Sequence, residues 1–318
     1  MKSTIVIPNY NGIRYLENCL RSLQTEAAYV IVVDNGSSDG SYELIEEKFP
    51  QIETIRFEEN TGFCKAVNAG IRASKTTYVI LLNNDTIVEP GFVQILENAM
   101  EKEEKVFSAS AKMISMQDKE KLDDAGDLYC ALGWAYAIGK GKPEKRYQRG
   151  YPIFSSCGGA SIFRKSILEE IGLFDENHFA YLEDVDLGYR AQIYGYRNIF
   201  VPDARIFHAG SASSGSRYNK FKVDLTSKNS VYLIYKNMPF LQILLNLPFF
   251  LIGFSIKALF FFQKGFGKAY VTGLFHGICL CASKQGKENK VAFQRDHFGN
   301  YCKIQLALWI NMVRRLFL

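Results

Sequence analysis

Two separate places in the sequence carry side chains able to hold a divalent cation. Asn84 and Asp85 follow the apolar run 78–82, so a carboxylate stands where a buried strand is expected to end. Mg²⁺ in proteins usually takes one or two carboxylates together with phosphate oxygens, so Asp85 alone could anchor the cation of a bound diphosphate. A capped turn is the simpler explanation of such an Asn-Asp pair. His208 follows a later apolar run, and an imidazole beside Asp85 would suit Mn²⁺ as well as Mg²⁺.

A third place carries side chains that could move a proton. Glu183, Asp184 and Asp186 put three carboxylates within four residues at the predicted start of a helix. Acids at a helix N-terminus are electrostatically favourable whatever the protein does. Because three of them after the aromatic segment 179–181 exceed what capping requires, the cluster is a candidate for a general base.

Glycine patterns favour a sugar substrate and disfavour two classes of nucleotide-binding protein. Gly158, Gly159 and Ala160 offer backbone without bulky side chains, as close approach of a sugar requires. The turn 8–12 lacks the G-x-G-x-x-G pattern, and no G-x-x-x-x-G-K-[ST] phosphate loop occurs in the sequence. A Rossmann dehydrogenase and a phosphate-loop NTPase are therefore disfavoured, and we expect a metal to bind any phosphates.

The segments that position these residues alternate between short apolar runs and stretches with the spacing of an amphipathic helix. Short apolar runs predict strands, and stretches with helical spacing between them predict helices. In the first hundred residues, the strands are expected at 4–7, 30–33, 52–57 and 78–82, and the helices at 15–23, 41–49, 63–73 and 92–100. This alternation predicts an α/β fold with a parallel, doubly wound sheet and helices on both faces. The ligand crevice of such a sheet lies beyond the carboxyl ends of its strands, where Asp85 stands.

The pattern is weaker beyond residue 100. Residues 117–151 are expected to be irregular. Regular structure is expected again at 155–164, in helices over 165–171 and 183–194, and in two short strands around Ile199 and Ile206.

Charge divides the chain into two regions with different expected roles. Residues 1–213 hold 23 Lys and Arg against 30 Asp and Glu, whereas residues 214–318 hold 15 against 3. A Ser/Gly-rich stretch at 210–215 marks the change. We therefore predict a catalytic domain over 1–215 and a basic, apolar helical region over 216–318. Seven scattered cysteines and an N-terminal apolar run too short for a signal peptide favour the cytoplasm.

The C-terminal region has the composition of a membrane-associated segment. Residues 240–262 are mostly apolar and long enough to span a bilayer, but polar and helix-breaking residues interrupt them. Lys257, Lys264 and Lys268 share a predicted helix face near several Phe, the pattern of a helix lying in the membrane interface, and 304–318 repeats it. Each such cation is worth about 1 kcal/mol near an anionic leaflet. We predict peripheral attachment, with a helical subdomain packed on the sheet or on a dimer partner as the alternative. Nucleic acid is disfavoured because no recognition module is present.

In their order along the chain, these motifs resemble glycosyltransferase family 2, the inverting nucleotide-sugar transferases with an A-type Rossmann-like fold. The resemblance covers roughly residues 3–215. It rests on Ile5–Gly12, Val32–Ser41, Asn60–Phe63 with Asn68, Leu82–Asp85, Gly158–Ala160, Gly172–Glu176, Glu183–Asp184 with Arg190 and Gly195, and His208. The motif set is most similar to bacterial rhamnosyltransferase-like members, which implies dTDP-rhamnose as donor. No residue identifiably reads a thymine methyl group, so UDP-sugars remain open.

The resemblance implies a role for each matching residue. Asp184 would be the catalytic base, and Glu183 would support it or contact the acceptor. Asp85 and His208 would hold Mg²⁺ or Mn²⁺. The nucleotide would be bound by Pro8, Tyr10, Asp34, Asn60, Asn68 and Asn84, and the sugar substrate by Gly158, Gly159 and Ala160. Asn83 replaces the first Asp of the family's D-x-D motif, which leaves the ribose contact open.

The implied function is transfer of a sugar from a nucleoside-diphosphate sugar to a hydroxyl of a lipid-linked or cell-surface glycan. It would take place at the cytoplasmic face of the cell membrane. A nucleotidyltransferase or other nucleotide-sugar enzyme is an alternative, but it needs a basic loop near the N-terminus, where only Arg14 follows the turn 8–12. A non-catalytic sugar-binding scaffold of the same fold is a second alternative. The presence of Asp85, Asp184 and His208 argues against it.

Overall fold

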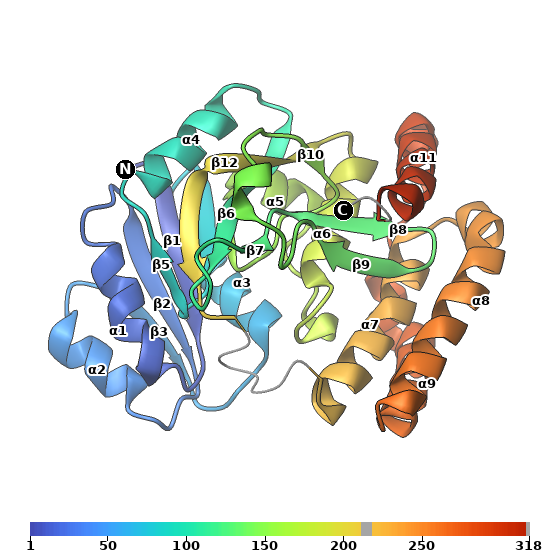
Figure 1. The fold of residues 1–318 in the computed structure, drawn as a ribbon, viewed down its shortest axis with the longest axis horizontal. Helices are drawn as coiled ribbons and strands as arrows, with labels where there is room; N and C mark the ends of the chain where they lie inside the picture. The colour runs from blue at the N-terminus through green and yellow to red at the C-terminus, as the bar shows by residue number, and fades with distance from the viewer. Residues whose placement is uncertain (211–217, 316–318) are drawn as a thin grey trace.

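The computed structural model describes residues 1–210 and 218–315, and its N-terminal part is a parallel sheet between helices (Figure 1). The strands are β1 (Ser3–Asn9), β2 (Tyr29–Asn35), β3 (Glu53–Phe57) and β4 (Tyr78–Leu82), paired in parallel in the order β4-β1-β2-β3. The helices are α1 (Ile13–Ser22), α2 (Ser41–Lys48), α3 (Phe63–Ala73) and α4 (Phe92–Glu101). The strands and helices predicted for the first hundred residues are confirmed.

The four strands on which the prediction of a parallel sheet rested are parallel, and the strands beyond residue 100 make the sheet as a whole mixed. The sheet continues beyond β4 in the order β11-β6-β12-β10. Strand β11 (Ala160–Arg164) runs antiparallel to both neighbours, β4 and β6 (Val106–Ser115). A parallel pairing requires a crossover, usually a helix. No helix of the α class lies between β6 and β11 in the described chain, so β11 enters the sheet reversed.

Two predictions about the part of the chain between residue 100 and the C-terminal region are wrong. The strands expected around Ile199 and Ile206 are one strand, β12 (Arg197–His208), with an irregularity between Val201 and Arg205. The stretch expected to be irregular contains β7 (Leu122–Asp124), the hairpin β8 (Asp127–Cys130) and β9 (Trp134–Ala137), and the 3-10 helix Glu144–Arg146. These strands have only three or four residues each, too few to show a period. The short strands β5 (Thr86–Val88) and β10 (Pro152–Ile153) pair with β12.

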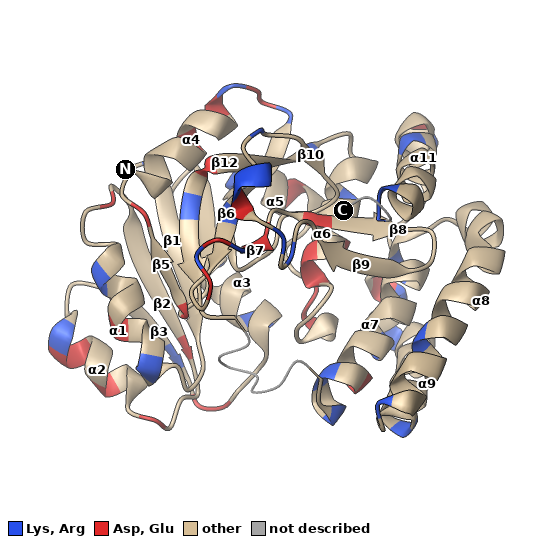
Figure 2. Cartoon of the chain, viewed as in Figure 1, with Lys and Arg blue, Asp and Glu red and all other residues tan. Residues whose placement is uncertain are grey.

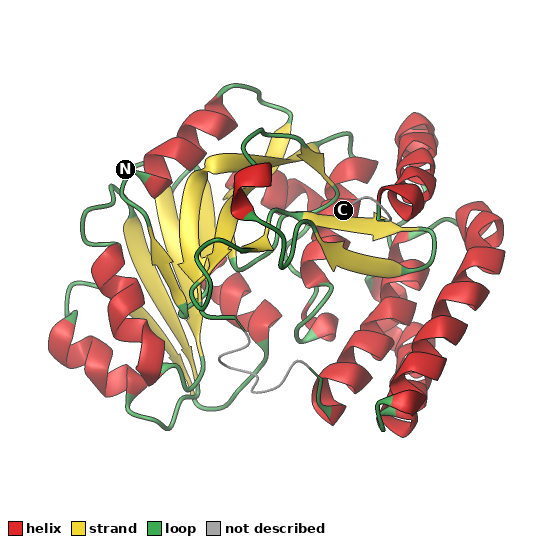
Figure 3. Ribbon diagram, in the orientation of Figure 1, coloured by secondary structure: helices red, strands yellow, loops and turns green. Residues whose placement is uncertain are grey.

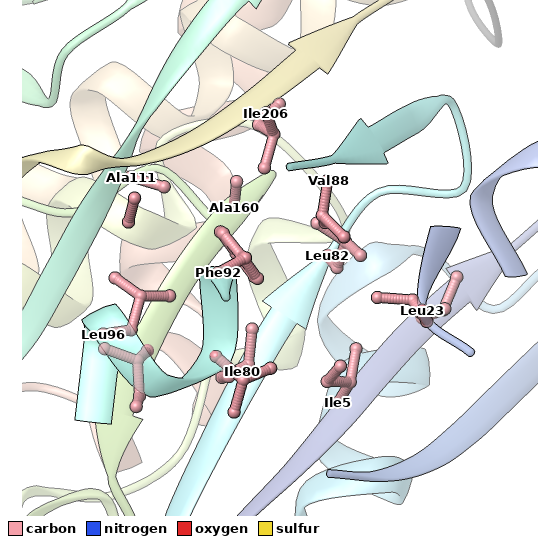
Figure 4. Close-up of a cluster of buried hydrophobic side chains, with 14 of the residues drawn as sticks. Ile5, Leu23, Ile80, Leu82, Val88, Phe92, Leu96, Ala111, Ala160 and Ile206 are labelled. Carbon is pink, nitrogen blue, oxygen red and sulfur yellow. The ribbon is translucent and has the colours of Figure 1, made fainter. Parts of the chain in front are cut away.

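Apolar side chains fill both faces of the sheet. One buried cluster joins β1, β4 and β12 to α4, and Figure 4 shows Ile5, Ile80, Phe92 and Ile206 within it. A second cluster lies on the opposite face, under α3, α5 (Lys165–Ile171) and α6 (Glu183–Ile193). This packing fixes the carboxyl ends of β1, β2 and β4 side by side.

Helices form the C-terminal region, which stands beside the sheet (Figures 1 and 3). They are α7 (Lys220–Asn237), α8 (Phe240–Gln263), α9 (Gly267–Ala282), α10 (Lys284–Glu288) and α11 (Phe298–Arg314). A third apolar cluster joins β8, α6, α7, α8 and α11, so the two predicted regions share one core. The predicted boundary at residue 215 and the linker 211–215 lie outside the described residues, as does 316–318 of the predicted second basic segment.

The predicted basic helix face is interrupted by a chain reversal. Helix α8 ends at Gln263, and Gly265 adopts φ 78° before α9 begins. Lys257 and Lys268 therefore lie on different helices. They do not form the single face that the spacing suggested, because the chain turns at Gly265 and a new helix begins at Gly267.

Candidate active site

The predicted metal and proton-transfer groups line one cavity. It encloses about 930 Å³ beyond the carboxyl ends of β1 and β4, and the hairpin β8–β9 and α7 contribute to its opposite wall. Asp85 and His208 line it, and so do Glu183 and Asp184. The tertiary structure therefore brings together groups that are about 100 residues apart in the chain.

Asparagines organise the end of the cavity near β1 and β2. Pro8, Tyr10, Asn60 and Asn84 line it, and these are four of the residues expected to bind the nucleotide. The side chain of Asn9 bridges two strands, donating to Asp34 Oδ1 at 3.0 Å and accepting from Asn84 Nδ2 at 2.7 Å. This pairing rigidifies the floor of the cavity.

The position of Asp34 differs from the prediction. It is fully buried and absent from the cavity lining, and its second oxygen accepts from the backbone N–H of Ser37 at 3.2 Å. Its neighbour Asn35 lines the cavity, donates to Asn60 Oδ1 at 3.0 Å and accepts from Thr61 N–H at 2.9 Å. Successive strand residues face opposite ways, and the sequence motif alone did not reveal which of the two faces the cavity.

Two other predicted contacts also lie off the cavity lining. Asn68 on α3 is buried and holds the backbone of Phe174, donating to its carbonyl at 2.8 Å and accepting from its N–H at 3.1 Å. Ala160 is buried at the start of β11, whereas Gly158 and Gly159 line the cavity. Asn68 thus acts structurally by fastening α3 to a neighbouring loop.

Asp85 and His208 form a donor set that fits a divalent cation. His208 Nε2 lies 3.2 Å from Asp85 Oδ1, and His208 Nδ1 lies 2.7 Å from Asp123 Oδ2. Burial lowers the pKa of His208, but hydrogen bonds to Asp123 and Asp85 outweigh it and raise that pKa to about 9. A cation at Nε2 would replace the proton there, because a histidine binds metal in its neutral form. Metal-binding histidines usually have their second ring nitrogen fixed by a carboxylate, the position that Asp123 occupies here. Sequence reasoning missed Asp123 because it lies in the stretch expected to be irregular.

A second acidic group lies deeper in the same region. Asp124, Asp127 and Cys157 bring three ligand atoms within 4.8 Å of one another and could hold a metal ion. Burial raises the pKa of all three side chains, that of Asp124 to about 7. With a pKa of about 7, Asp124 is partly protonated near neutral pH. It was also missed, because the sequence separates Cys157 from the two acids.

The three acids around the start of α6 have different environments. Burial raises the pKa of Asp184 to about 6, although its Oδ1 accepts the N–H of Val185 at 2.7 Å. Burial and the nearby Asp184 raise the pKa of Glu183 well above its usual value, and its Oε2 has no hydrogen-bond partner among the described residues. Neighbouring carboxyl groups whose pKa values are shifted by burial are typical of sites of general acid–base catalysis.

Asp186 has a structural role instead. It is fully buried, and its Oδ2 lies 3.0 Å from Arg190 and 2.9 Å from Lys236. Burial alone would raise its pKa, but these two cations hold it far below its ordinary value. Asp186 therefore stays ionised and ties α6 to α7.

Comparison with known proteins identifies related sequences and folds. The model of the family described as "Glycosyl transferase family 2" matches residues 4–172, just over half of the chain. The N-acetylglucosaminyl-diphospho-decaprenol L-rhamnosyltransferase of Mycobacterium tuberculosis (strain CDC 1551 / Oshkosh) is 28% identical over 242 residues. That alignment covers 66% of this chain and 77% of the relative.

Two solved structures share the fold. A GalNAc-T7 structure with UDP, GalNAc and Mn²⁺ has a TM-score of 0.61 at 18% identity, covering 74% of this chain and 48% of that protein. The mannosyltransferase PcManGT from Pyrobaculum calidifontis, in complex with GDP-Man and Mn²⁺, has a TM-score of 0.53 at 16% identity. It covers 96% of this chain and 84% of that protein.

Proposed function

The chain belongs to glycosyl transferase family 2 and is a nucleotide-sugar glycosyltransferase, and on this premise we propose its reaction. It transfers a sugar with inversion from a nucleoside-diphosphate sugar to a hydroxyl of a lipid-linked or cell-surface glycan. The observation that carries the proposal is the single cavity shared by Asp85, His208, Glu183 and Asp184.

Asp184 is the base in this proposal. An acceptor hydroxyl is a poor nucleophile near neutral pH, and a carboxylate that accepts its proton accelerates attack by roughly 10²- to 10⁴-fold. With a pKa of about 6, Asp184 is mostly ionised at pH 7 while remaining basic enough to take the proton. Burial and the neighbouring Asp184 raise the pKa of Glu183 well above its usual value, which favours its neutral form, and a neutral carboxyl can donate a hydrogen bond to the acceptor.

Asp85 and His208 would hold the divalent cation, Mg²⁺ or Mn²⁺. A bound cation supplies Lewis-acid stabilisation of the negative charge on the departing nucleoside diphosphate. Asp123 holds the His208 ring so that Nε2 faces Asp85. Gly158 and Gly159 leave room on the lining for the sugar.

The relatives and the C-terminal helices support the proposed donor, acceptor and location. The name of the mycobacterial relative supports an L-rhamnosyl donor and a polyprenyl-diphosphate acceptor. Helix α8 is long and apolar enough to cross a membrane by length and composition, which supports action at a membrane surface. We propose the cytoplasmic face, with dTDP-rhamnose as donor.

A panel of dTDP-, UDP- and GDP-sugars tests the proposal, with thermal stability and donor hydrolysis measured with and without Mn²⁺. We expect stabilisation and slow hydrolysis with one donor, dTDP-rhamnose, only when the metal is present. Asp85→Ala should lose both, whereas Asp184→Asn should keep donor binding and lose turnover. Binding of a nucleotide sugar without hydrolysis or transfer would instead support a non-catalytic sugar-binding protein. A different preferred donor would overturn the rhamnose assignment alone.

A further inference from the structure

The outer surface of the C-terminal helices is apolar to an unusual degree. Leu251 and Leu259 of α8 are 63% and 65% exposed, and Phe275 of α9 is 63% exposed. Leu244, Ile278 and Val313 of α8, α9 and α11 are about half exposed or more. We call this surface the apolar face. Helices α8 and α9 pack against each other, and exposed apolar side chains gathered on neighbouring helices mark an interaction site.

The side of α8 that faces the protein carries polar residues beside the buried Phe250. Asn246 is fully buried and exchanges two amide hydrogen bonds with Gln305 of α11, both at 2.8 Å. Gln242 accepts the hydroxyl of Tyr189 at 2.8 Å. Lys257 lies 5.8 Å from the centroid of the Trp134 ring. A helix on a water-exposed surface has the reverse arrangement, apolar inside and polar outside.

Helix α9 packs on α7 through small residues. An added Cβ at Gly273 would lie 2.2 Å from the carbonyl oxygen of Asp224, and one at Gly277 would lie 2.6 Å from that of Lys228. The spacing is G-x-x-x-G, which allows close helix packing where the hydrophobic effect does not hold helices together. The polar contacts of α8 and the close packing of α9 would both persist in an apolar solvent.

We propose that the apolar face inserts into one leaflet of an anionic lipid bilayer. The side of α8 that carries Gln242 and Asn246 is covered by protein, so lipid contacts only the other side of the helix and α8 lies in the interface without crossing. Residues 214–318 carry 15 Lys and Arg against 3 Asp and Glu, and Figure 2 shows basic residues at the shared end of α7 and α9. A second copy of the chain would bring two positive surfaces together, whereas anionic lipid neutralises them.

Flotation with vesicles tests whether a lipid bilayer is the partner of the apolar face. The inference rests on the proposed function, which places the enzyme at a membrane. Wild-type protein should float with vesicles of phosphatidylcholine and phosphatidylglycerol and bind phosphatidylcholine alone more weakly. The triple variant Leu251→Gln, Leu259→Gln, Phe275→Gln should lose binding to both. Tyr29→Gln, which also removes an exposed aromatic but on the sheet side of the molecule, should bind like the wild type.

The outcomes distinguish lipid from protein as the occupant. If the wild type is a dimer without lipid and the triple variant is a monomer, the apolar face is a protein interface and the proposal is wrong. Retained vesicle binding by the triple variant also overturns it. Mn²⁺-dependent donor hydrolysis, measured without vesicles, should be unchanged in the triple variant. Its absence in the wild type would reject the proposed function and leave lipid binding standing.

A separate observation concerns the loop before the catalytic acids. Phe179, Tyr181 and Leu182 have φ of 64°, 69° and 66°, a left-handed conformation that costs non-glycine residues about 1–3 kcal/mol each. All three line the cavity, directly before Glu183 and Asp184. Such strain persists only where the surroundings hold it.

The side chain of Asn229 of α7 holds this loop in its conformation. Its side chain is fully buried, and Nδ2 lies 3.0, 2.8 and 2.7 Å from the carbonyl oxygens of His178, Ala180 and Tyr181. We infer that Asn229 is a positioning residue, which fixes the strained loop and thereby places the carboxylate of Asp184 in the cavity. A helix of the C-terminal region thus helps to form the active site.

The test separates positioning from stability and rests on the proposed role of Asp184. Asn229→Asp keeps the size but removes the N–H donors, so we expect kcat to fall about 100-fold, as for a misplacement of about 1 Å. Nucleotide affinity should stay within about twofold. The control Ser230→Ala removes a buried hydroxyl of the same helix that bonds only within α7, and kcat should hold. Normal kcat in Asn229→Asp, where Asp184→Asn is inactive, overturns the inference. Normal turnover in Asp184→Asn would show instead that Asp184 is not the catalytic base.

Discussion

At the residue scale, the pH dependence of turnover reports on Asp184. Because its folded-state pKa is about 6, its basic form is lost below that pH and dominates above about 7. The proposed mechanism therefore predicts that kcat rises with pH through about 6 and then levels off. Initial rates between pH 5 and 8 measure this directly. If kcat does not fall below pH 6, another group takes the proton. Thermal unfolding measured at each pH controls for loss of folded protein.

Asp123 provides a second prediction at this scale. Removing the side chain in Asp123→Ala frees the His208 ring from its 2.7 Å contact, and loss of such a supporting carboxylate costs roughly 10- to 100-fold in metal affinity. Titration of Mn²⁺ by electron paramagnetic resonance measures this without any turnover. The control Asp118→Ala removes an exposed carboxylate from the same stretch and should leave Mn²⁺ affinity unchanged.

At the element scale, a buried ion cluster fastens α6 and the 175–178 loop to α7. Lys236 Nζ lies 2.8 Å from Asp175 Oδ2 and 2.9 Å from Asp186 Oδ2, and all three side chains are almost fully buried. Lys236→Met leaves two buried carboxylates short of a cation. Breaking a buried pair in this way lowers the free energy of unfolding by about 3–5 kcal/mol.

Chemical denaturation checks this prediction against a matched surface lysine. Lys284→Met removes a cation that is 84% exposed and 3.8 Å from Glu288, so the free energy of unfolding should change by no more than about 1 kcal/mol. Equal effects of the two substitutions would mean that the buried cluster gives no net stabilisation to the α6–α7 contact.

At the scale of the whole molecule, the shared core predicts that the catalytic and helical regions unfold together. Tyr189 of α6, Leu233 of α7 and Leu308 of α11 belong to one buried cluster. Thermal unfolding followed by the fluorescence of Trp134 and Trp309 should therefore coincide with the loss of nucleotide binding. Two separated transitions would show instead that residues 1–215 form an independent domain, as the charge pattern suggested.

The sequence by itself determined the order of the first strands and helices and the identities of the key groups. Apolar runs of four to six residues with helical stretches between them are sufficient evidence for β1 to β4, and Asp85 follows from its place after one of them. Periodicity could not place β7, β8 and β9, because strands of three or four residues show no period. Asp123 and Asp127 were therefore missed.

Only the tertiary structure decided which residues face the cavity. Asp34 and Asn35 are adjacent, yet one is buried beneath the floor and the other lines the cavity, because strand side chains alternate and the neighbouring strands fix which face is covered. The sequence likewise gave no reason to connect Asn229 with Asp184. Their relation exists because α7 packs against the loop that precedes α6, a contact between segments about 50 residues apart that depends on the folded core.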